Sequence, residues 1–358
     1  MNNEPGQANC TVSVIVPARN EEVSLGACLD SLIAQTGVEF EIIVVDDHST
    51  DGTRAIAASF AAASPGIVSV VEAGPLPDGW TGKNNAVTTG VRHARREWLL
   101  FTDADTAHLP GSLARALIEA QEQHAEMLSY SPEQIAVTFW EMAVLPVVFA
   151  ELARQYPPSK VSDPNFPEAA ANGQYILIRR EAYDAVGGHA AVAGEILEDV
   201  ALARRVKAAG RKIRFRYAAD AVRTRMYRNW PQLRDGWTKN LALLFPRPGW
   251  LAVKTFLIWT ALWAVLGTAL FPPAEWPSWI STLLFAVLFV PFIWQRQKLE
   301  KANFPLNATI LAILFGMPIF AYLLLRSKRA HSKGNVPWKG RTYSDKTHLG
   351  NQPLTTND

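Results

Sequence analysis

The chain has 358 residues, 49% of them hydrophobic, and a formal net charge of +2. This composition excludes a disordered chain, a collagen-like chain and a disulfide-stabilised scaffold. The small net charge is a cancellation: residues 1–210 carry 14 basic and 27 acidic side chains, whereas residues 211–358 carry 21 basic and 6 acidic ones. The two halves therefore need separate explanations.

The amino-terminal segment and the cysteine content predict a cytoplasmic first half. Residues 1–9 are polar and contain neither a basic stretch nor an apolar run, so no secretory signal peptide is expected. Two cysteines in a long chain, Cys10 and Cys28, are typical of a reducing compartment and do not form a disulfide framework.

Strands and helices are predicted to alternate along the first half. Four short apolar runs are typical of buried strands, at residues 12–16, 41–45, 68–71 and 98–101. Helices are predicted after the first three, with caps at Ser24 and Asp51 and a third helix starting at Asn84 or Asn85. This alternation predicts an α/β fold with a mainly parallel sheet covered by helices.

Polar side chains follow these strands, at the sheet edge where parallel α/β proteins bind ligands. They are Asn20, Asp46, Asp47, Asp103 and Asp105. Mg²⁺ and Mn²⁺ bind one or two carboxylates and take their other ligands from water and phosphate oxygens. The two carboxylates of Asp103-Ala104-Asp105 suit such an ion. The alternative interpretation of this sequence is a solvated turn. Asp46 and Asp47 either accept hydrogen bonds from a base or ribose, or cap a helix.

Two further positions suggest chemistry. Lys83 follows a Gly/Pro-rich loop at residues 74–82, and a lysine near a helix start favours a diphosphate; an ordinary surface lysine is the alternative. Glu198 and Asp199 precede an amphipathic helix, where the dipole favours acidic residues. Asp199 is also a candidate general base, and both interpretations can hold at once.

One apolar stretch within the first half is unusual. Residues 135–150 contain Glu141 inside the stretch and Pro146 near its end. The stretch is too short and too charged to span a bilayer comfortably, so an interfacial or acceptor-lining helix is expected, with an ordinary core helix as the alternative.

Three apolar runs dominate the second half, at residues 255–271, 278–294 and 306–325, and none contains Asp, Glu, Lys or Arg. Because about 20 residues cross a hydrocarbon core of ~30 Å, a multi-pass membrane protein is predicted. Basic residues between the second and third runs place that link inside by the positive-inside rule. Gly316 and Pro318 interrupt the third run, which is either a third span or a re-entrant hairpin.

The motifs of the first half, in this order, resemble those of family 2 glycosyltransferases of the GT-A fold. They are VSVIVPARNEE, EIIVVDDHSTDGT, WTGKNNA, FTDAD, NGQYILIRREAYDAVGGH and EDVALARRVKAAG, and they cover most of residues 12–210. The resemblance implies a nucleotide-sugar donor bound by Pro17, Ala18, Arg19, Asn20, Glu21, Asp46, Asp47, Lys83 and Asp103. It further implies Mg²⁺ or Mn²⁺ on Asp105 with Asp103, and catalysis by Asp199 with Glu198.

The second half is similar to carotenoid glycosyltransferases of the staphyloxanthin type and to hopanoid-associated membrane members. The similar segments are LRDGWTKN, at residues 233–240, and VPWKGRTYS, at residues 336–344. The resemblance implies an acceptor or gating role for Gln232, Arg234, Trp237 and Lys239. Processive members carry Q-x-x-R-W, whereas Trp237 lies three residues beyond Arg234. This departure favours single sugar transfer over polysaccharide synthesis.

The prediction is an inverting glycosyltransferase of the inner membrane. Its expected parts are a cytoplasmic catalytic domain at residues 1–210, a basic juxtamembrane region at 211–254, membrane segments at 255–325 and a basic tail at 326–358. The juxtamembrane region has 11 basic and 2 acidic side chains, and its adjacency to the apolar runs favours anionic lipid over nucleic acid.

The acceptor is expected to be an isoprenoid or carotenoid-like lipid. A hydroxyl acceptor is favoured over a carboxylate, which is ionised at neutral pH and needs no base. The alternatives are a processive polysaccharide synthase and a non-catalytic nucleotide-sugar-binding membrane protein. A transporter is disfavoured by the uncharged runs, and a Rossmann dehydrogenase by the absence of G-x-G-x-x-G after the first strand.

Overall fold

The structure is a computed structural model that describes residues 11–334, 336–338 and 340–343. Cys10, the amino-terminal residues 1–9, and Lys339 and Ser344 of the tail motif lie outside the described residues. The described chain forms two compact units, one of residues 11–133 and 156–225, the other of residues 134–155 and 226–343.

The first unit is built on a seven-stranded sheet with the order β3-β2-β1-β4-β8-β6-β9. Its strands are β1 (Thr11–Ala18), β2 (Glu39–Asp46), β3 (Val68–Glu72), β4 (Trp98–Phe101), β6 (Met127–Ser131), β8 (Ile176–Arg179) and β9 (Ile213–Tyr217). Strand β8 is antiparallel to β4 and β6, and the other neighbouring pairs are parallel. The predicted α/β fold with a mainly parallel sheet is confirmed.

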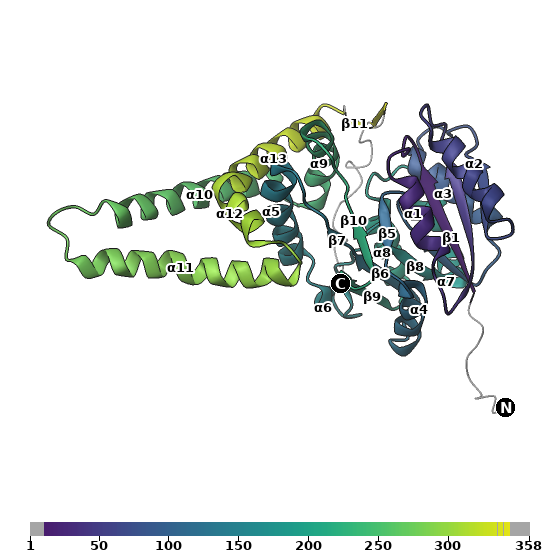
Figure 1. The fold of residues 1–358 in the computed structure, drawn as a ribbon, viewed down its shortest axis with the longest axis horizontal. Coiled ribbons are helices and arrows are strands. Elements are labelled where there is room, and N and C mark those ends of the chain that lie inside the picture. Colours follow the sequence, from purple (N-terminus) through teal and green to yellow (C-terminus); the bar gives the residue numbers. More distant parts are fainter. Residues whose placement is uncertain (1–10, 335, 339, 344–358) are drawn as a thin grey trace, which may run out of the picture. The chain divides into compact units, whose positions relative to one another are not determined.

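Helices cover both faces of this sheet (Figure 1). They are α1 (Leu25–Ile33), α2 (Thr53–Ala63), α3 (Gly82–His93), α4 (Ser112–Glu122), α6 (Pro158–Val161), α7 (Arg180–Ala185), the 3₁₀ helix η1 (Gly188–Val192) and α8 (Glu198–Ala208). Alternate residues of β1 point to opposite faces: Val14 and Val16 join the core under α1, whereas Ile15 joins the core under α3. Because both faces are buried, the strands appear as continuous apolar runs in the sequence.

A second small sheet has the order β5-β10-β7, formed by β5 (Thr106–His108), β10 (Val222–Thr224) and β7 (Glu133–Gln134). The first unit therefore extends past the boundary predicted at residue 210. The basic residues just beyond that point belong to the sheet: Arg214 and Arg216 pair with Glu119 at 2.9 and 2.8 Å.

The start of one helix and the capping bond of another differ from the prediction, although α1 does begin directly after Ser24. Helix α3 begins at Gly82, ahead of Asn84, because the Thr81 side chain accepts the Asn84 N–H at 3.2 Å. The Ser24 hydroxyl donates to Glu21 and makes no cap bond to α1.

The second unit is helical, with one small hairpin. Its elements are α5 (Phe139–Gln155), α9 (Trp230–Leu244), α10 (Pro248–Leu270), α11 (Ser278–Lys301), α12 (Leu306–Leu311), the π helix η2 (Ala312–Gly316), α13 (Met317–Ser332), β11 (Val336–Trp338) and β12 (Arg341–Tyr343). Among the described residues two helical runs, Pro248–Leu270 and Leu306–Ser332, are long and apolar enough to cross a membrane, and Trp279–Val290 is a shorter apolar stretch. Helices α10 and α11 run side by side (Figure 1).

The third apolar run forms one continuous helix from Leu306 to Ser332, without the reversal that a re-entrant hairpin requires. A π turn at η2 precedes Pro318, which lacks the N–H that a regular helix would use there. Part of the run lies in the core of the second unit: Leu324 is fully buried, and the Ser327 hydroxyl donates to the Thr238 carbonyl of α9 at 2.6 Å.

Candidate functional site

The carboxyl ends of β1, β2 and β4 meet at one edge of the sheet. Ala18 lies opposite Asp46 in the β1–β2 register, and Ile15 lies opposite Phe101 in the β1–β4 register. The loops that follow these strands are therefore neighbours. The last residues of these strands and the loops after them carry most of the residues predicted to bind a ligand: Pro17, Ala18, Arg19, Asn20, Glu21, Asp46, Asp47, Asp103 and Asp105.

The loops after β1 and β2 are joined by reciprocal hydrogen bonds. Asn20 N donates to Ser49 Oγ at 3.1 Å, and Thr50 N donates to Asn20 Oδ1 at 2.9 Å. Asn20 and His48 both have φ of 54°, in the left-handed region that an asparagine tolerates better than most residues. These bonds hold the two loops in one fixed arrangement.

The same pair of loops buries two carboxylates. Asp46 and Asp47 are 2% and 4% exposed, and Ser49 N donates to Asp46 Oδ1 at 3.2 Å. Arg19 Nη1 donates to the Asp47 carbonyl at 2.6 Å, which fixes the backbone of the second loop against the first. Glu21 N donates to Thr53 Oγ1 at 2.7 Å, so the backbone of this glutamate also joins the loop after β1 to the start of α2.

Lys83 lies at the centre of the second group of predicted residues. Its Nζ is 2.8 Å from Asp103 Oδ1 and 2.8 Å from Glu198 Oε1, so it joins the first turn of α3 to the loop after β4 and the start of α8. Burial alone lowers the pKa of Lys83, but the two carboxylates raise it well above its usual value. The side chain is therefore a fixed positive charge.

Asp199 is held by backbone amides. Its Oδ2 accepts the Gly173 N–H and its Oδ1 accepts its neighbour Val200 N–H, both at 2.8 Å. Burial, followed by the charge of Glu198, raises the pKa of Asp199 to about 6, although Lys83 and the amides act in the opposite direction. A carboxylate with this pKa is mostly ionised at neutral pH and is still basic enough to take a proton.

Gly173 is a site residue that the sequence did not reveal. A Cβ at this position would lie 3.0 Å from Lys83 Nζ and 3.4 Å from both Asp199 Oδ2 and Glu198 Oε1. The glycine therefore leaves room for three charged groups to gather around one peptide. Its closeness to them depends on long-range folding, and the only local signal is the Asn-Gly pair ahead of β8.

Asp103 and Asp105 meet the requirements of a small divalent cation. Both are half-buried, while Ala104 between them is buried. Among the described residues no group of three or more His, Cys, Asp and Glu gathers to form a complete metal cage. A pair of carboxylates fits Mg²⁺ or Mn²⁺, which take their remaining ligands from phosphates and water. In the structure Asp103 pairs with the positive charge of Lys83.

The remaining predicted residues lie in the second unit, on α9, where each has a structural contact. Gln232 and Asn229 both bond backbone amides at the start of the helix, since Gln232 Oε1 accepts the Arg228 N–H at 2.9 Å and Asn229 Oδ1 accepts the Gln232 N–H at 3.0 Å. Trp237 is buried in the core of this unit. The charged residues are also in contact: Arg234 pairs with Asp235 at 2.8 Å, and Lys239 lies over the Trp338 ring.

Helix α5 also belongs to the second unit, where the carboxylate of Glu141 has a local explanation. Glu141 Oε2 accepts the Thr138 N–H at 2.7 Å and the Val137 N–H at 3.2 Å, which is a capping box at the start of the helix. Val144 and Val148 are fully buried in the core of this unit. The core-helix interpretation therefore accounts for the buried half of α5.

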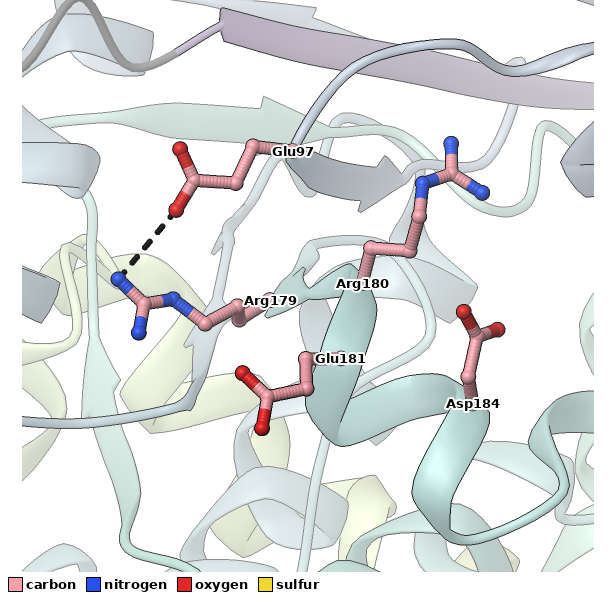
Figure 2. A pocket seen from close by; sticks show the side chains of 5 residues that line it. All are labelled: Glu97, Arg179, Arg180, Glu181 and Asp184. Atoms are coloured by element: carbon pink, nitrogen blue, oxygen red, sulfur yellow. Dashed lines mark ion pairs between the residues drawn. The ribbon is translucent and has the colours of Figure 1, made fainter.

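A separate hollow lies at the opposite edge of the sheet, where β4 begins and β8 ends. It is lined by Glu97, Arg179, Arg180, Glu181 and Asp184 (Figure 2). Arg179 Nη2 pairs with Glu97 Oε1 at 3.3 Å, and acidic and basic groups are nearly balanced around it. The hollow contains none of the predicted site residues.

The chain is similar to proteins of known function over most of its length. The sequence pattern described as "Glycosyl transferase family 2" matches residues 13–187. Over 351 residues the chain is 30% identical to 4,4'-diaponeurosporenoate glycosyltransferase of Staphylococcus aureus strain MRSA252, covering 93% of this chain and 88% of the relative. The protein of that name from strain USA300 is 29% identical over 350 residues, with the same coverage.

A solved structure shares the fold. The mannosyltransferase PcManGT from Pyrobaculum calidifontis, in complex with GDP-Man and Mn²⁺, aligns with a TM-score of 0.55 and 19% identity, covering 89% of this chain and 86% of that one. This likeness concerns the fold alone.

Proposed function

The chain belongs to glycosyltransferase family 2 and has its GT-A fold, and from this premise we propose that it transfers a single sugar from a nucleotide-diphosphate sugar to a carotenoid or isoprenoid lipid. The observation that carries the proposal is the gathering of Lys83 and the Glu198-Asp199 pair around Gly173, with Asp103 paired to Lys83, at the carboxyl edge of the sheet. This arrangement supplies a positive charge for a diphosphate next to a base for the acceptor.

The donor is assigned to the joined loops and to Lys83. The rigid loops after β1 and β2 carry Asp46 and Asp47, whose carboxylates accept N–H groups of a base or hydroxyls of a ribose. Lys83 lies in the first turn of α3, so its charge and the helix N-terminus both face a diphosphate in the same region. Asp103 and Asp105 would hold Mg²⁺ or Mn²⁺, which would supply positive charge against the leaving diphosphate.

Asp199 is assigned as the general base. It takes the proton of an acceptor hydroxyl as the hydroxyl oxygen forms a bond to the anomeric carbon, and the bond from that carbon to the diphosphate oxygen breaks. Attack from the side opposite the leaving group inverts the configuration. Glu198 holds Lys83 and raises the pKa of Asp199, so it acts through its neighbours.

The acceptor class follows from the relatives and from the second unit. The matched S. aureus proteins are named for 4,4'-diaponeurosporenoate, a carboxylate, whereas a base such as Asp199 favours a hydroxyl. We keep the hydroxyl as the proposed acceptor group on the same class of lipid. An acceptor or gating role for Gln232, Arg234, Trp237 and Lys239 stays a prediction.

A membrane location is proposed from the exposed apolar helices. Leu257 on α10 and Phe289 on α11 are 60% and 61% exposed, and Trp250 and Trp279 near the starts of these helices are exposed, as interfacial tryptophans are. We propose that the protein is a multi-pass inner-membrane protein with a cytoplasmic catalytic unit.

Incubation of membranes that carry the full chain with labelled nucleotide sugars and a carotenoid or isoprenoid lipid tests the proposal. The expected product is a lipid heavier by one sugar, formed only with Mg²⁺ or Mn²⁺ and lost in Asp199→Asn. A product with several sugars would support the processive alternative. Nucleotide-sugar binding without turnover with any lipid would support the non-catalytic alternative.

A further inference from the structure

A buried network of hydroxyl groups lies behind the turn at residues 103–105. Thr106 Oγ1 donates to the Asp103 carbonyl at 2.8 Å, and Thr224 Oγ1 donates to the Asp105 carbonyl at 3.2 Å. Thr106 and Thr224 lie opposite each other in the register of β5 and β10, and each is 2% exposed. The small sheet therefore supports both ends of the turn that carries the two carboxylates.

Gln174 connects this network to the neighbourhood of Asp199. Its Nε2 donates to Thr224 Oγ1 at 3.2 Å, and its carbonyl accepts the Thr102 hydroxyl at 2.8 Å. The preceding residue is Gly173, whose N–H donates to Asp199 at 2.8 Å. Gln174 thus contacts the hydroxyl network behind residues 103–105 and is bonded directly to Gly173, whose N–H holds Asp199.

The Thr224 hydroxyl makes both hydrogen bonds that connect the Asp105 carbonyl to the Gln174 side chain. A threonine hydroxyl has one hydrogen, and here it is given to the Asp105 carbonyl, so the oxygen accepts from Gln174. Loss of the hydroxyl removes both bonds at once, and a buried hydrogen bond that loses one partner is costly. Serine retains both bonds, whereas valine has nearly the same shape and retains neither.

We propose that Thr224 and Gln174 are positioning residues that hold the turn at residues 103–105 in a fixed place relative to Asp199. The inference rests on the proposed function, because that function requires a cation held on one side and a base on the other in fixed geometry. Neither residue touches the reacting atoms: Thr224 acts through the Asp105 carbonyl, and Gln174 acts through Thr224 and the adjoining Gly173 peptide.

The structural part of the proposal is tested on the ligand-free full chain by hydrogen–deuterium exchange. Thr224→Val should increase exchange in two separate segments, residues 102–106 and residues 172–175, and Thr224→Ser should restore protection. The matched control is Thr88→Val on α3, because the Thr88 hydroxyl is buried and has no hydrogen-bond partner among the described residues. Increased exchange confined to residues 222–225 would overturn the connection.

The functional part is tested by Mn²⁺ binding and by kinetics. Electron paramagnetic resonance measures Mn²⁺ binding in the presence of UDP and, separately, of GDP. The Mn²⁺ affinity of Thr224→Val should be about tenfold lower than that of the wild type. The kcat of this variant should fall by about tenfold to a hundredfold. Thr224→Ser should restore both values, and Thr88→Val should leave both unchanged. Unchanged affinity and kcat in Thr224→Val would overturn the positioning role.

A second variant guards against misfolding of the first. Gln174→Met keeps the length of the side chain and removes the donor to Thr224 together with an amide oxygen that has no hydrogen-bond partner among the described residues, so it should shift exchange and Mn²⁺ affinity in the same direction by a smaller factor. If Gln174→Met shows the same hydrogen–deuterium exchange and the same Mn²⁺ affinity as the wild type, the proposal is also overturned. If the wild-type chain transfers no sugar, the proposed function fails, and the exchange experiment still decides whether the connection exists.

Discussion

The Lys83 ammonium lies 2.8 Å from the Asp103 carboxylate, so the two groups assigned to the diphosphate and to the cation neutralise each other in the ligand-free protein. Both must change partners when a metal–nucleotide complex enters. A cation alone competes with Lys83 for the Asp103 oxygen, whereas a cation arriving with a diphosphate gives Lys83 a new partner.

Metal binding should therefore depend on the nucleotide. Lys83→Met should bind free Mn²⁺ about tenfold more tightly than the wild type in the absence of nucleotide, because the competing charge is gone. Lys83→Arg retains a positive charge and should behave like the wild type. Titrations followed by electron paramagnetic resonance measure both, and equal Mn²⁺ affinities in the Met and Arg variants would contradict the competition.

Transfer to a hydroxyl should depend on pH through Asp199. The pKa of this carboxylate is raised to about 6, and only the ionised form accepts a proton, so kcat/KM should fall about tenfold per pH unit below that value and level off above it. Glu198→Gln removes a charge that raises the pKa and should move the inflection to lower pH. An inflection that moves to higher pH would contradict the assigned cause.

The capping box of α5 should contribute to the stability of the second unit. Glu141→Ala leaves the Thr138 and Val137 amides without their acceptor, and should lower the free energy of unfolding by about 1–2 kcal/mol. Glu141→Gln keeps an acceptor oxygen and should cost less. Denaturant unfolding of the purified full chain measures the difference, and equal losses in the two variants would show that the amides do not need this acceptor.

The exposed apolar surface of α10 and α11 should determine membrane association. Replacing both Leu257 and Phe289 with Arg places two charges on this surface and should move a large share of the protein out of the membrane fraction in a flotation assay. The control is Ile118→Arg on α4 of the first unit, because Ile118 is also exposed. An equal shift in the control would point to aggregation or misfolding and not to a lipid contact.

Much of the first unit could be predicted because its signals are local. The strand at Trp98–Phe101 is a short apolar run, and Asp103 and Asp105 follow it directly, so their place at the carboxyl edge follows from the parallel sheet. Gly173 could not be found in this way. Its importance comes from Lys83 and Asp199, which lie 90 and 26 positions away in the chain and approach it only in the fold.

The organisation of the chain was harder to predict than its elements. In the sequence, helix α5 lies between strands of the first unit, but in the structure it packs in the core of the second unit. The hydropathy of the sequence does not reveal to which unit this helix belongs. The capping patterns Thr138-x-x-Glu141 and Asn229-x-x-Gln232 are present in the sequence, and they account for the backbone contacts of Glu141 and Gln232. Single sugar transfer was favoured by the spacing of Gln232, Arg234 and Trp237, and the relatives support it.

The most direct test of the central claim is to measure the mass of the lipid product formed by wild-type membranes and by Asp199→Asn membranes. Each is incubated with a labelled nucleotide sugar, a hydroxylated carotenoid or isoprenoid acceptor, and Mn²⁺. The account predicts a lipid heavier by one sugar in the wild type, and a loss of about 10²- to 10⁴-fold in rate in Asp199→Asn with donor binding retained. Full turnover in Asp199→Asn, or label recovered only in a soluble saccharide, would contradict it.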